Sequence, residues 1–254
     1  LQTIVYTFLT HPMEALAPEK APSRIMLPEE KIREFSRLGI DILVLNSFDD
    51  LFLRQTPRVF MDQLYQKYPI KALVVGYDFR FGFRGAGDRS FLENEAGEKG
   101  WKLICVPPVM DGDKIVSSTL IRGFLAEGKV EEASRLLAGP YRIKGRIVHG
   151  YGRGKNLGFP TANLQFSHHK VIPWPGVYLT ECRLGRQSLW GVTNVGRNPT
   201  FSTDRISIEV YLPDFEGDLY GRILIVSFLA RIRDEKKFEK VSDLIEQMRR
   251  DVEN

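Results

Sequence analysis

AGPYRIKGRIVHG, residues 138–150, is the stretch at which the pattern of the chain changes. Its first three residues form a turn signal, and the following residues alternate between apolar and polar types, as in a half-buried β-strand. Beyond this stretch, strand patterns follow one another with almost no helical pattern. Before it, strand and helical patterns alternate. We therefore expect two domains, residues 1–138 and 139–254.

The second half carries a series of strand candidates separated by turn signals. They are residues 141–149, 176–184, 188–194, 206–212 and 223–232. This series predicts a small antiparallel β-barrel. Apolar residues then recur at helical spacing from Phe238 to Met248, which predicts a helix that packs on the barrel.

The first half is typical of an α/β domain with a mainly parallel sheet. Its clearest strands are residues 3–8, 41–46 and 72–76, and helical patterns separate them. Thr56 and Pro57 indicate the N-cap and first residue of one of these helices.

Composition narrows the class of protein. No window approaches eighteen consecutive apolar residues, so no membrane partner is expected. The only cysteines, Cys105 and Cys182, exclude a disulfide framework and fit a reducing cytoplasm. The net charge of +4 alone does not choose between nucleic acid, an acidic membrane surface and small polyanions such as ATP and flavin phosphates. The basic residues are mixed with 32 acidic ones and form no long run, so no nucleic-acid partner is expected. The sequence leaves the oligomeric state open.

A glycine-rich loop, GYGRGKNLGFPTAN at residues 150–163, follows the first strand of the second half. Glycines let backbone amides approach phosphate oxygens, and two cations supply compensating charge. The candidate ATP-binding residues are Gly152, Arg153, Gly154 and Lys155. The spacing matches neither the P-loop nor the dinucleotide fingerprint, and an ordinary connecting loop is the alternative.

Thr161 and Asn163 point to the same side if their segment is extended. Magnesium prefers oxygen ligands and is commonly held by few protein groups together with substrate phosphates. The pair therefore indicates a site for Mg²⁺ bound with ATP. The alternative is that both side chains bond to turn backbone.

Glu209 lies in RISIEVYL, residues 205–212, where apolar and polar residues alternate. The carboxylate should project from the polar face of this strand, where it could accept a proton from a substrate hydroxyl as a general base. The alternative is that Glu209 is only a solvent-exposed residue on the polar face of the strand, without a catalytic role.

Four motifs in this half resemble the riboflavin kinase module: LGFPTAN, GVTNVGRNPTF, IEVYLPDFEGDLYG and RDEKKF, which begin at residues 157, 191, 208 and 233. The resemblance implies a six-stranded Greek-key barrel that phosphorylates riboflavin to FMN. It implies magnesium-ATP at Thr161 and Asn163, and Glu209 as the base toward the ribityl 5′-hydroxyl. Asn194 and Arg233 are the implied flavin-binding residues.

Two motifs in the first half, VGYDFRFG from residue 75 and VSSTLIR from residue 116, resemble the FMN adenylyltransferase domain of bacterial bifunctional FAD synthetases. The resemblance implies a nucleotidyltransferase-like, Rossmann-like domain that converts FMN to FAD with release of pyrophosphate. The implied nucleotide- and flavin-binding residues are His11, Gly76, Asp78, Phe79, Ser117, Ser118, Thr119 and Arg122. The hydroxyl residues at the start of this helix, with Arg122 one turn further on, would suit an anion-binding site. The alternative is that the hydroxyls only cap the helix.

The front of the sequence departs from this pattern. Thr10 stands where the family usually has proline, and the family's first strand and its GNFDGVHxGH segment have no counterpart. Without that segment, little FAD synthesis is expected, whereas the adenylyltransferase assignment stands for a protein that carries it. Two further alternatives are a kinase with a vestigial front domain and a non-catalytic regulator that binds flavin or nucleic acid.

Overall fold

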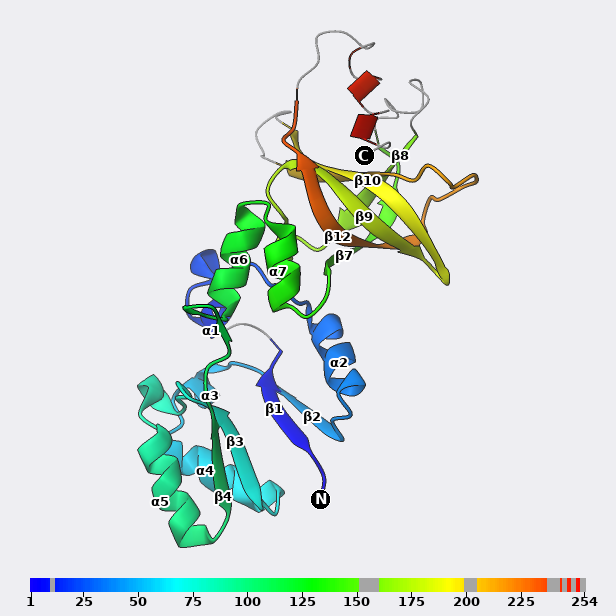
Figure 1. Ribbon diagram of the computed structural model, residues 1–254. Coiled ribbons are helices and arrows are strands. Elements are labelled where there is room, and N and C mark those ends of the chain that lie inside the picture. Colours follow the sequence, from blue (N-terminus) through cyan, green and yellow to red (C-terminus); the bar gives the residue numbers. More distant parts are fainter. Residues whose placement is uncertain are drawn as a thin grey trace. The chain divides into compact units, whose positions relative to one another are not determined.

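The computed structural model describes residues 1–9, 12–150, 160–198, 205–236, 243, 246, 247, 250 and 251. The chain forms two compact units (Figure 1). We call Leu1–Pro22 with Met26–Val116 the α/β unit, and Ser23–Ile25 with Ser117–Asn254 the barrel unit. Each is described by itself.

Parallel strand pairing organises the α/β unit, as predicted. β1 (Ile4–Phe8) pairs with β2 (Ile42–Asn46), and β3 (Ala72–Gly76) pairs with β4 (Lys102–Val106). The two pairs are separate sheets among the described strands. The other elements are α1 (Pro12–Leu16), α2 (Pro28–Arg37), α3 (Asp50–Leu53), α4 (Pro57–Lys67), α5 (Arg89–Lys99), two 3-10 turns (Pro18–Lys20 and Phe83–Gly85) and the hairpin of β5 (Met110–Asp111) and β6 (Lys114–Ile115).

The core of the α/β unit lies where α4 and α5 meet the β3–β4 pair. Met61 and Leu92 are fully buried there, and Val75 and Trp101 are nearly so. Helix α4 begins as predicted, because the Thr56 hydroxyl accepts a hydrogen bond from the Val59 amide at 3.3 Å.

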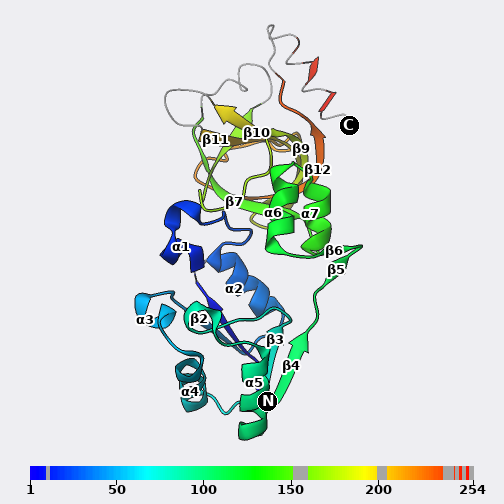
Figure 2. The same cartoon turned by 90° about the vertical axis from the view of Figure 1, so that its left-hand side faces the viewer.

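The barrel unit contains a closed antiparallel barrel, which confirms the predicted fold of the second half (Figure 2). Around the ring the strand order is β10, β11, β8, β7, β12, β9. The strands are β7 (Tyr141–Val148), β8 (Thr161–Phe166), β9 (Gly176–Leu184), β10 (Gln187–Asn198), β11 (Arg205–Tyr211) and β12 (Ile223–Arg233). The pattern of apolar and polar residues did not predict β8 as a strand. The resemblance to a family with a six-stranded barrel implied a sixth strand.

Alternate residues along each strand fill the barrel. On β7, Tyr141, Ile143 and Ile147 are buried, and on β11, Ile208 and Val210 are buried. The residues between them on β11 point to the other face, as the period of two requires. This alternation places Glu209 on the outer, polar face of the barrel.

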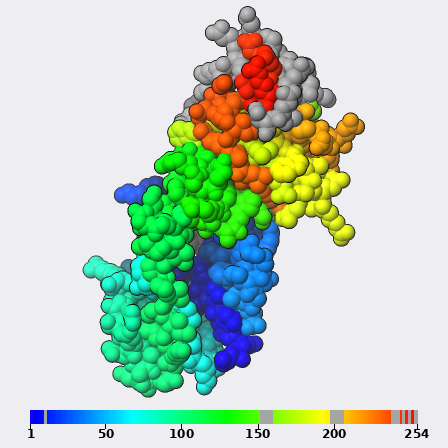
Figure 3. Space-filling model, viewed as in Figure 1, coloured from blue at the N-terminus to red at the C-terminus, as the bar shows by residue number. Residues whose placement is uncertain are grey.

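Helices α6 (Ser118–Ala126) and α7 (Val130–Leu136) pack against the barrel (Figure 3). At the turn between them Gly128 has a φ of +75°, and a methyl group there would lie 2.7 Å from Arg231 Nε. The Glu131 carboxylate accepts a hydrogen bond from the Arg231 amide at 3.1 Å. Both helices fall within residues 1–138, which the sequence pattern predicts as the first domain, and the domain boundary between residues 138 and 139 stays a prediction.

The predicted closing helix is not confirmed, because most of residues 237–254 lie outside the described residues. Residues 243, 246, 247, 250 and 251 are helical. In the described part of the chain, no helix has the length and apolar character needed to span a membrane.

Candidate functional sites

Three polar side chains form one row across neighbouring strands of the barrel. In the β11–β8 pairing Glu209 is opposite Asn163, and in the β10–β11 pairing Glu209 is opposite Asn194. Directly opposite residues of antiparallel strands have Cβ atoms about 4.5 to 5.5 Å apart. The predicted base therefore lies between a predicted metal ligand and a predicted flavin-binding residue, and all three side chains are half-buried.

Thr161 connects to this row by a hydrogen bond. Its hydroxyl donates to Glu209 Oε2 at 3.2 Å. Thr161 is opposite Tyr211 in the pairing of β8 with β11, so Thr161 and Asn163 share the face that carries Glu209. Here the sequence pattern correctly predicted the side of the strand on which both residues lie.

Asn163 is also in contact with the start of the glycine-rich loop. A methyl group on Gly150 would lie 2.1 Å from Asn163 Nδ2 and 2.4 Å from its Cγ, so only glycine fits here beside the amide. The proposed phosphate-binding residues Gly152, Arg153, Gly154 and Lys155 lie outside the described residues, and so does His11.

The donor set of this face suits a hard cation shared with a phosphate. Thr161 and Asn163 offer oxygen atoms beside the Glu209 carboxylate, and magnesium takes such ligands while keeping water and phosphate oxygens. Among the described residues, no group of three or more His, Cys, Asp or Glu side chains could hold a metal ion.

His149 and Tyr220 form an aromatic pair at the edge of this site. Their rings are stacked with centroids 3.7 Å apart and planes 25° apart. His149 directly precedes Gly150 and is exposed. Sequence spacing gave no signal for the pair, because the two residues belong to distant segments.

Arg233, the other residue that the resemblance assigned to flavin binding, is engaged in an ion pair. Its Nε and Nη2 donate to the two carboxylate oxygens of Asp251 at 2.9 and 2.6 Å. The side chains are 15% and 3% exposed, and Gln247 donates to the same carboxylate at 3.0 Å. The guanidinium thus holds residue 251 against the end of β12.

The predicted adenylyltransferase residues of the α/β unit lie at the carboxyl end of β3. Gly76 is the last residue of β3, and its carbonyl accepts a hydrogen bond from the Phe79 amide at 3.2 Å, which closes a turn around Asp78. All three residues are exposed. Ligands of parallel α/β folds bind at the carboxyl ends of strands, so their position is suitable.

The remaining predicted residues open α6 in the barrel unit. The Ser117 hydroxyl caps the helix by accepting from the Leu120 amide at 3.2 Å, as the capping alternative required. Ser118 and Thr119 are exposed, and Arg122 Nε donates to the Ser23 carbonyl at 2.8 Å.

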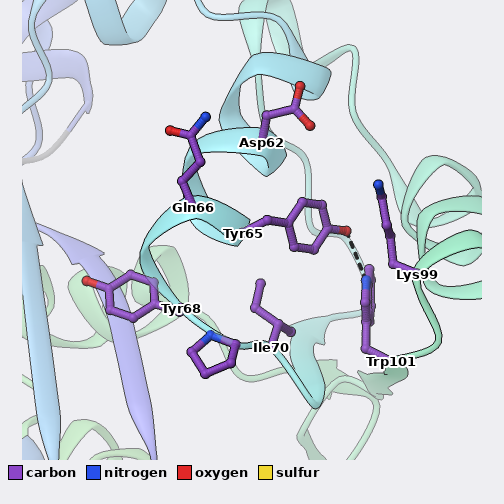
Figure 4. Close-up of a pocket in the computed structure, with 8 residues that line it drawn as sticks. Asp62, Tyr65, Gln66, Tyr68, Ile70, Lys99 and Trp101 are labelled. Atoms are coloured by element: carbon purple, nitrogen blue, oxygen red, sulfur yellow. Dashed lines mark hydrogen bonds between the residues drawn. The ribbon is translucent and has the colours of Figure 1, made fainter.

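A hollow of about 480 Å³ lies at the opposite, amino ends of β3 and β4 (Figure 4). Tyr65 and Trp101 line it, and Trp101 Nε1 donates to the Tyr65 hydroxyl at 2.9 Å. Tyr65 in turn donates at 3.1 Å to Glu95, which is buried and also bonds Arg58. These hydrogen bonds satisfy the polar atoms of Trp101, Tyr65 and Glu95 within the fold. No predicted site residue lines the hollow.

Comparison with known proteins matches both halves of the chain. Residues 137–254 match the family model described as riboflavin kinase, and residues 1–120 match that described as FAD synthetase. The bifunctional riboflavin kinase/FMN adenylyltransferase of Bacillus subtilis (strain 168) is 36% identical, over 99% of this chain and 80% of the relative. Its counterpart in Escherichia coli (strain K12) is 37% identical, over 99% and 80%.

A crystal structure described as a macrolide-efflux protein from Streptococcus pneumoniae superposes with a TM-score of 0.92. It is 35% identical in sequence, and the match covers 100% of this chain and 83% of that one. The family models and the curated relatives agree with the motifs of both halves and with the closed six-stranded barrel. The chain belongs to the family of bifunctional riboflavin kinase/FMN adenylyltransferases.

Proposed function

We propose that the barrel domain, residues 139–254, transfers the γ-phosphoryl group of ATP to riboflavin and so makes FMN. We propose further that the α/β domain, residues 1–138, transfers the adenylyl group of ATP to FMN and so makes FAD. The observation that carries the first assignment is the row of Asn163, Glu209 and Asn194 with Thr161 bonded to the central carboxylate.

In the kinase step Glu209 accepts the proton of the ribityl 5′-hydroxyl. That oxygen forms a bond to the γ-phosphorus as the bond to the β–γ bridging oxygen breaks, and ADP leaves. Positioning and charge neutralisation dominate phosphoryl transfer, and a general base adds a factor of about 10² to 10⁴. A half-buried strand residue holds its carboxylate in a fixed direction, which suits this task.

Thr161 and Asn163 would hold Mg²⁺, and Gly152, Arg153, Gly154 and Lys155 would cover the ATP phosphates. The ion neutralises charge on the phosphates when it is bound. The contact between Gly150 and the Asn163 amide supports this arrangement, because it ties the start of the loop to a proposed ligand. Asn194 and Arg233 would contribute to the flavin site.

In the adenylyl step a phosphate oxygen of FMN attacks the α-phosphorus of ATP, and pyrophosphate leaves. Ser117, Ser118, Thr119 and Arg122 would bind the anionic groups, since they combine helix amides, hydroxyls and a guanidinium. Gly76, Asp78, Phe79 and His11 would contact the nucleotide or flavin. We place both reactions in a reducing cytoplasm, which suits a chain with two free cysteines.

The test incubates the natural protein with riboflavin, ATP and magnesium, and separates the flavins by chromatography. FMN and then FAD are expected, with pyrophosphate released in the second step. Glu209→Ala should slow FMN formation from riboflavin by about 10² to 10⁴ and leave FAD formation from added FMN intact. A wild-type protein that makes no FMN would overturn the kinase assignment.

The same assay separates the two alternatives. A kinase with a vestigial front domain makes FMN but no FAD from added FMN, whereas a non-catalytic regulator makes neither product. A nucleic-acid-binding regulator would also show an affinity that falls steeply with salt.

A further inference from the structure

A second carboxylate lies close to the proposed kinase site. Glu235 follows the end of β12, and its Oε1 lies 2.6 Å from the position that a methyl group on Gly196 would occupy. In the pairing of β10 with β11, Gly196 is opposite Ser207, two residues along the strands from the opposed pair of Asn194 and Glu209 and therefore on the same face. Glu235 thus covers the sheet face that carries Glu209.

Gly196 makes room for this carboxylate. A distance of 2.6 Å is too short for a carbon–oxygen contact, so any side chain at residue 196 would displace the Glu235 carboxylate. The same position lies 3.1 Å from Asn194 Nδ2 and 3.5 Å from Ser207 Oγ. A carboxylate, an amide and a hydroxyl therefore meet over the backbone of Gly196.

These groups suit a ligand with several hydroxyls. A carboxylate only accepts hydrogen bonds, whereas an amide and a hydroxyl both accept and donate. Residues two apart on a strand are separated by about 6.6 Å. A chain of hydroxyl-bearing carbons can span that distance. Its terminal hydroxyl would then lie at Glu209, and its inner hydroxyls would lie near the Glu235, Asn194 and Ser207 side chains above Gly196.

We propose that Glu235 is a substrate-positioning residue of the kinase reaction, which accepts hydrogen bonds from the inner ribityl hydroxyls while Glu209 takes the proton of the terminal one. The inference rests on the proposed kinase function and assigns Glu235 no role as base. A carboxylate that is exposed in the free protein becomes covered by the polyol when the flavin binds.

The first test compares Glu235→Ala with wild type in steady-state kinetics. Loss of hydrogen bonds to a charged group should raise the KM for riboflavin about 10- to 100-fold, with little change in the KM for ATP or in the requirement for magnesium. Glu235→Gln, which keeps an acceptor oxygen, should restore part of the affinity. Glu181→Gln, an exposed strand carboxylate on β9 bonded to Ser188, is the matched control and should behave as wild type.

Gly196→Ala provides an independent route to the same defect. The added methyl should displace the flexible Glu235 carboxylate and raise the KM for riboflavin. In the double variant Gly196→Ala/Glu235→Ala the alanine at residue 196 should add little, because the group that it displaces is gone. Thermal unfolding checks that each variant is folded. If Gly196→Ala does not fold, the kinetics of Glu235→Ala alone test the proposal.

Binding of two flavins without ATP identifies the part of the substrate that is recognised. Glu235→Ala should weaken riboflavin binding, measured by flavin fluorescence, and leave lumiflavin, which has no ribityl chain, unaffected. A wild-type protein that forms no FMN removes the proposed function itself. If the wild type is active, an unchanged riboflavin affinity in Glu235→Ala, an equal loss for lumiflavin, or a change confined to ATP or magnesium overturns the positioning role alone.

Discussion

The Thr161 hydroxyl donates to Glu209 Oε2 across 3.2 Å, which joins the strand of the proposed metal ligands to the strand of the proposed base. The donated proton occupies one carboxylate oxygen and leaves Oε1 to accept the proton of a substrate hydroxyl. The hydroxyl oxygen of Thr161 keeps lone pairs for a cation. One hydrogen bond therefore fixes the direction of the base relative to the metal ligands.

Glu209→Ala and Glu209→Gln should each lower the kcat of FMN formation by about 10² to 10⁴, because neither side chain can take a proton from the alcohol. The Kd for ATP should change little, since the nucleotide is held by other groups. Rapid-quench measurement of FMN and titration with ATP check the two quantities. Turnover close to wild type in Glu209→Gln would remove the base assignment.

Gly150→Ala should impair the use of magnesium-ATP without affecting riboflavin binding. The new methyl would lie 2.1 Å from Asn163 Nδ2, so the amide must move away from its place beside Glu209. We expect the KM for magnesium-ATP to rise about 10-fold or more, as for a lost charge-assisted contact. Steady-state kinetics at varied magnesium measure this.

Gly139→Ala is the matched control, because a methyl group at that position meets no atom within 4 Å. A Gly139→Ala protein with the same defect would show that the loss comes from general destabilisation. Equal kinetics in Gly150→Ala and wild type would argue against Asn163 as a ligand.

The parts of the fold that the sequence predicted best are those governed by local periodicity. Alternation along residues 205–212 correctly predicts that Ile208, Val210 and Leu212 are buried and that Glu209 lies on the outer face. The same pattern is wrong for Ile206, which is 37% exposed near the start of the strand. The N-cap at Thr56 also followed from local chemistry. Local rules work here because burial and capping depend on the residue and its near neighbours.

Contacts between distant segments could not be obtained in this way. Nothing near Arg233 in the sequence indicates that its partner is Asp251, and nothing near Gly196 indicates the approach of Glu235. β8 was missed as a strand because it follows a glycine-rich loop and begins with polar residues, so its pattern resembles a turn. The closure of the barrel, rather than local propensity, makes this segment a strand.

Arg233→Ala should destabilise the barrel unit, because Asp251 would be left as a buried, unpaired carboxylate. Breaking a buried ion pair from one side costs about 3 to 5 kcal/mol, whereas removal of both partners costs less. Urea unfolding of Arg233→Ala, Asp251→Ala and the double variant measures this, and the double variant should recover part of the loss. Additive losses would contradict a direct pairing.

The same variants test the predicted contact of Arg233 with flavin. If the guanidinium also contacts the flavin, the double variant should still bind riboflavin weakly after its stability is recovered. Riboflavin affinity that follows stability through the whole series would instead limit Arg233 to holding the C-terminal segment.

Cys182 should make the stability of the protein fall at alkaline pH. The residue is fully buried, and burial raises the pKa of its thiol from 9.0 to about 11. The folded protein therefore holds the thiol proton more tightly than the unfolded chain. The stabilisation is complete below pH 9 and is lost as the pH rises through 11, with a total of about 3 kcal/mol.

Urea unfolding at a series of pH values between 8 and 11 measures this loss, and single substitutions assign it. Cys105→Ala keeps the buried thiol and should show the wild-type pH dependence. Cys182→Ala is less stable at every pH because it leaves a small cavity, but its free energy of unfolding should fall less steeply above pH 9. Only Cys182→Ala lacks the buried thiol. If the free energy of unfolding falls equally steeply with pH in both variants, groups other than Cys182 cause the alkaline loss of stability.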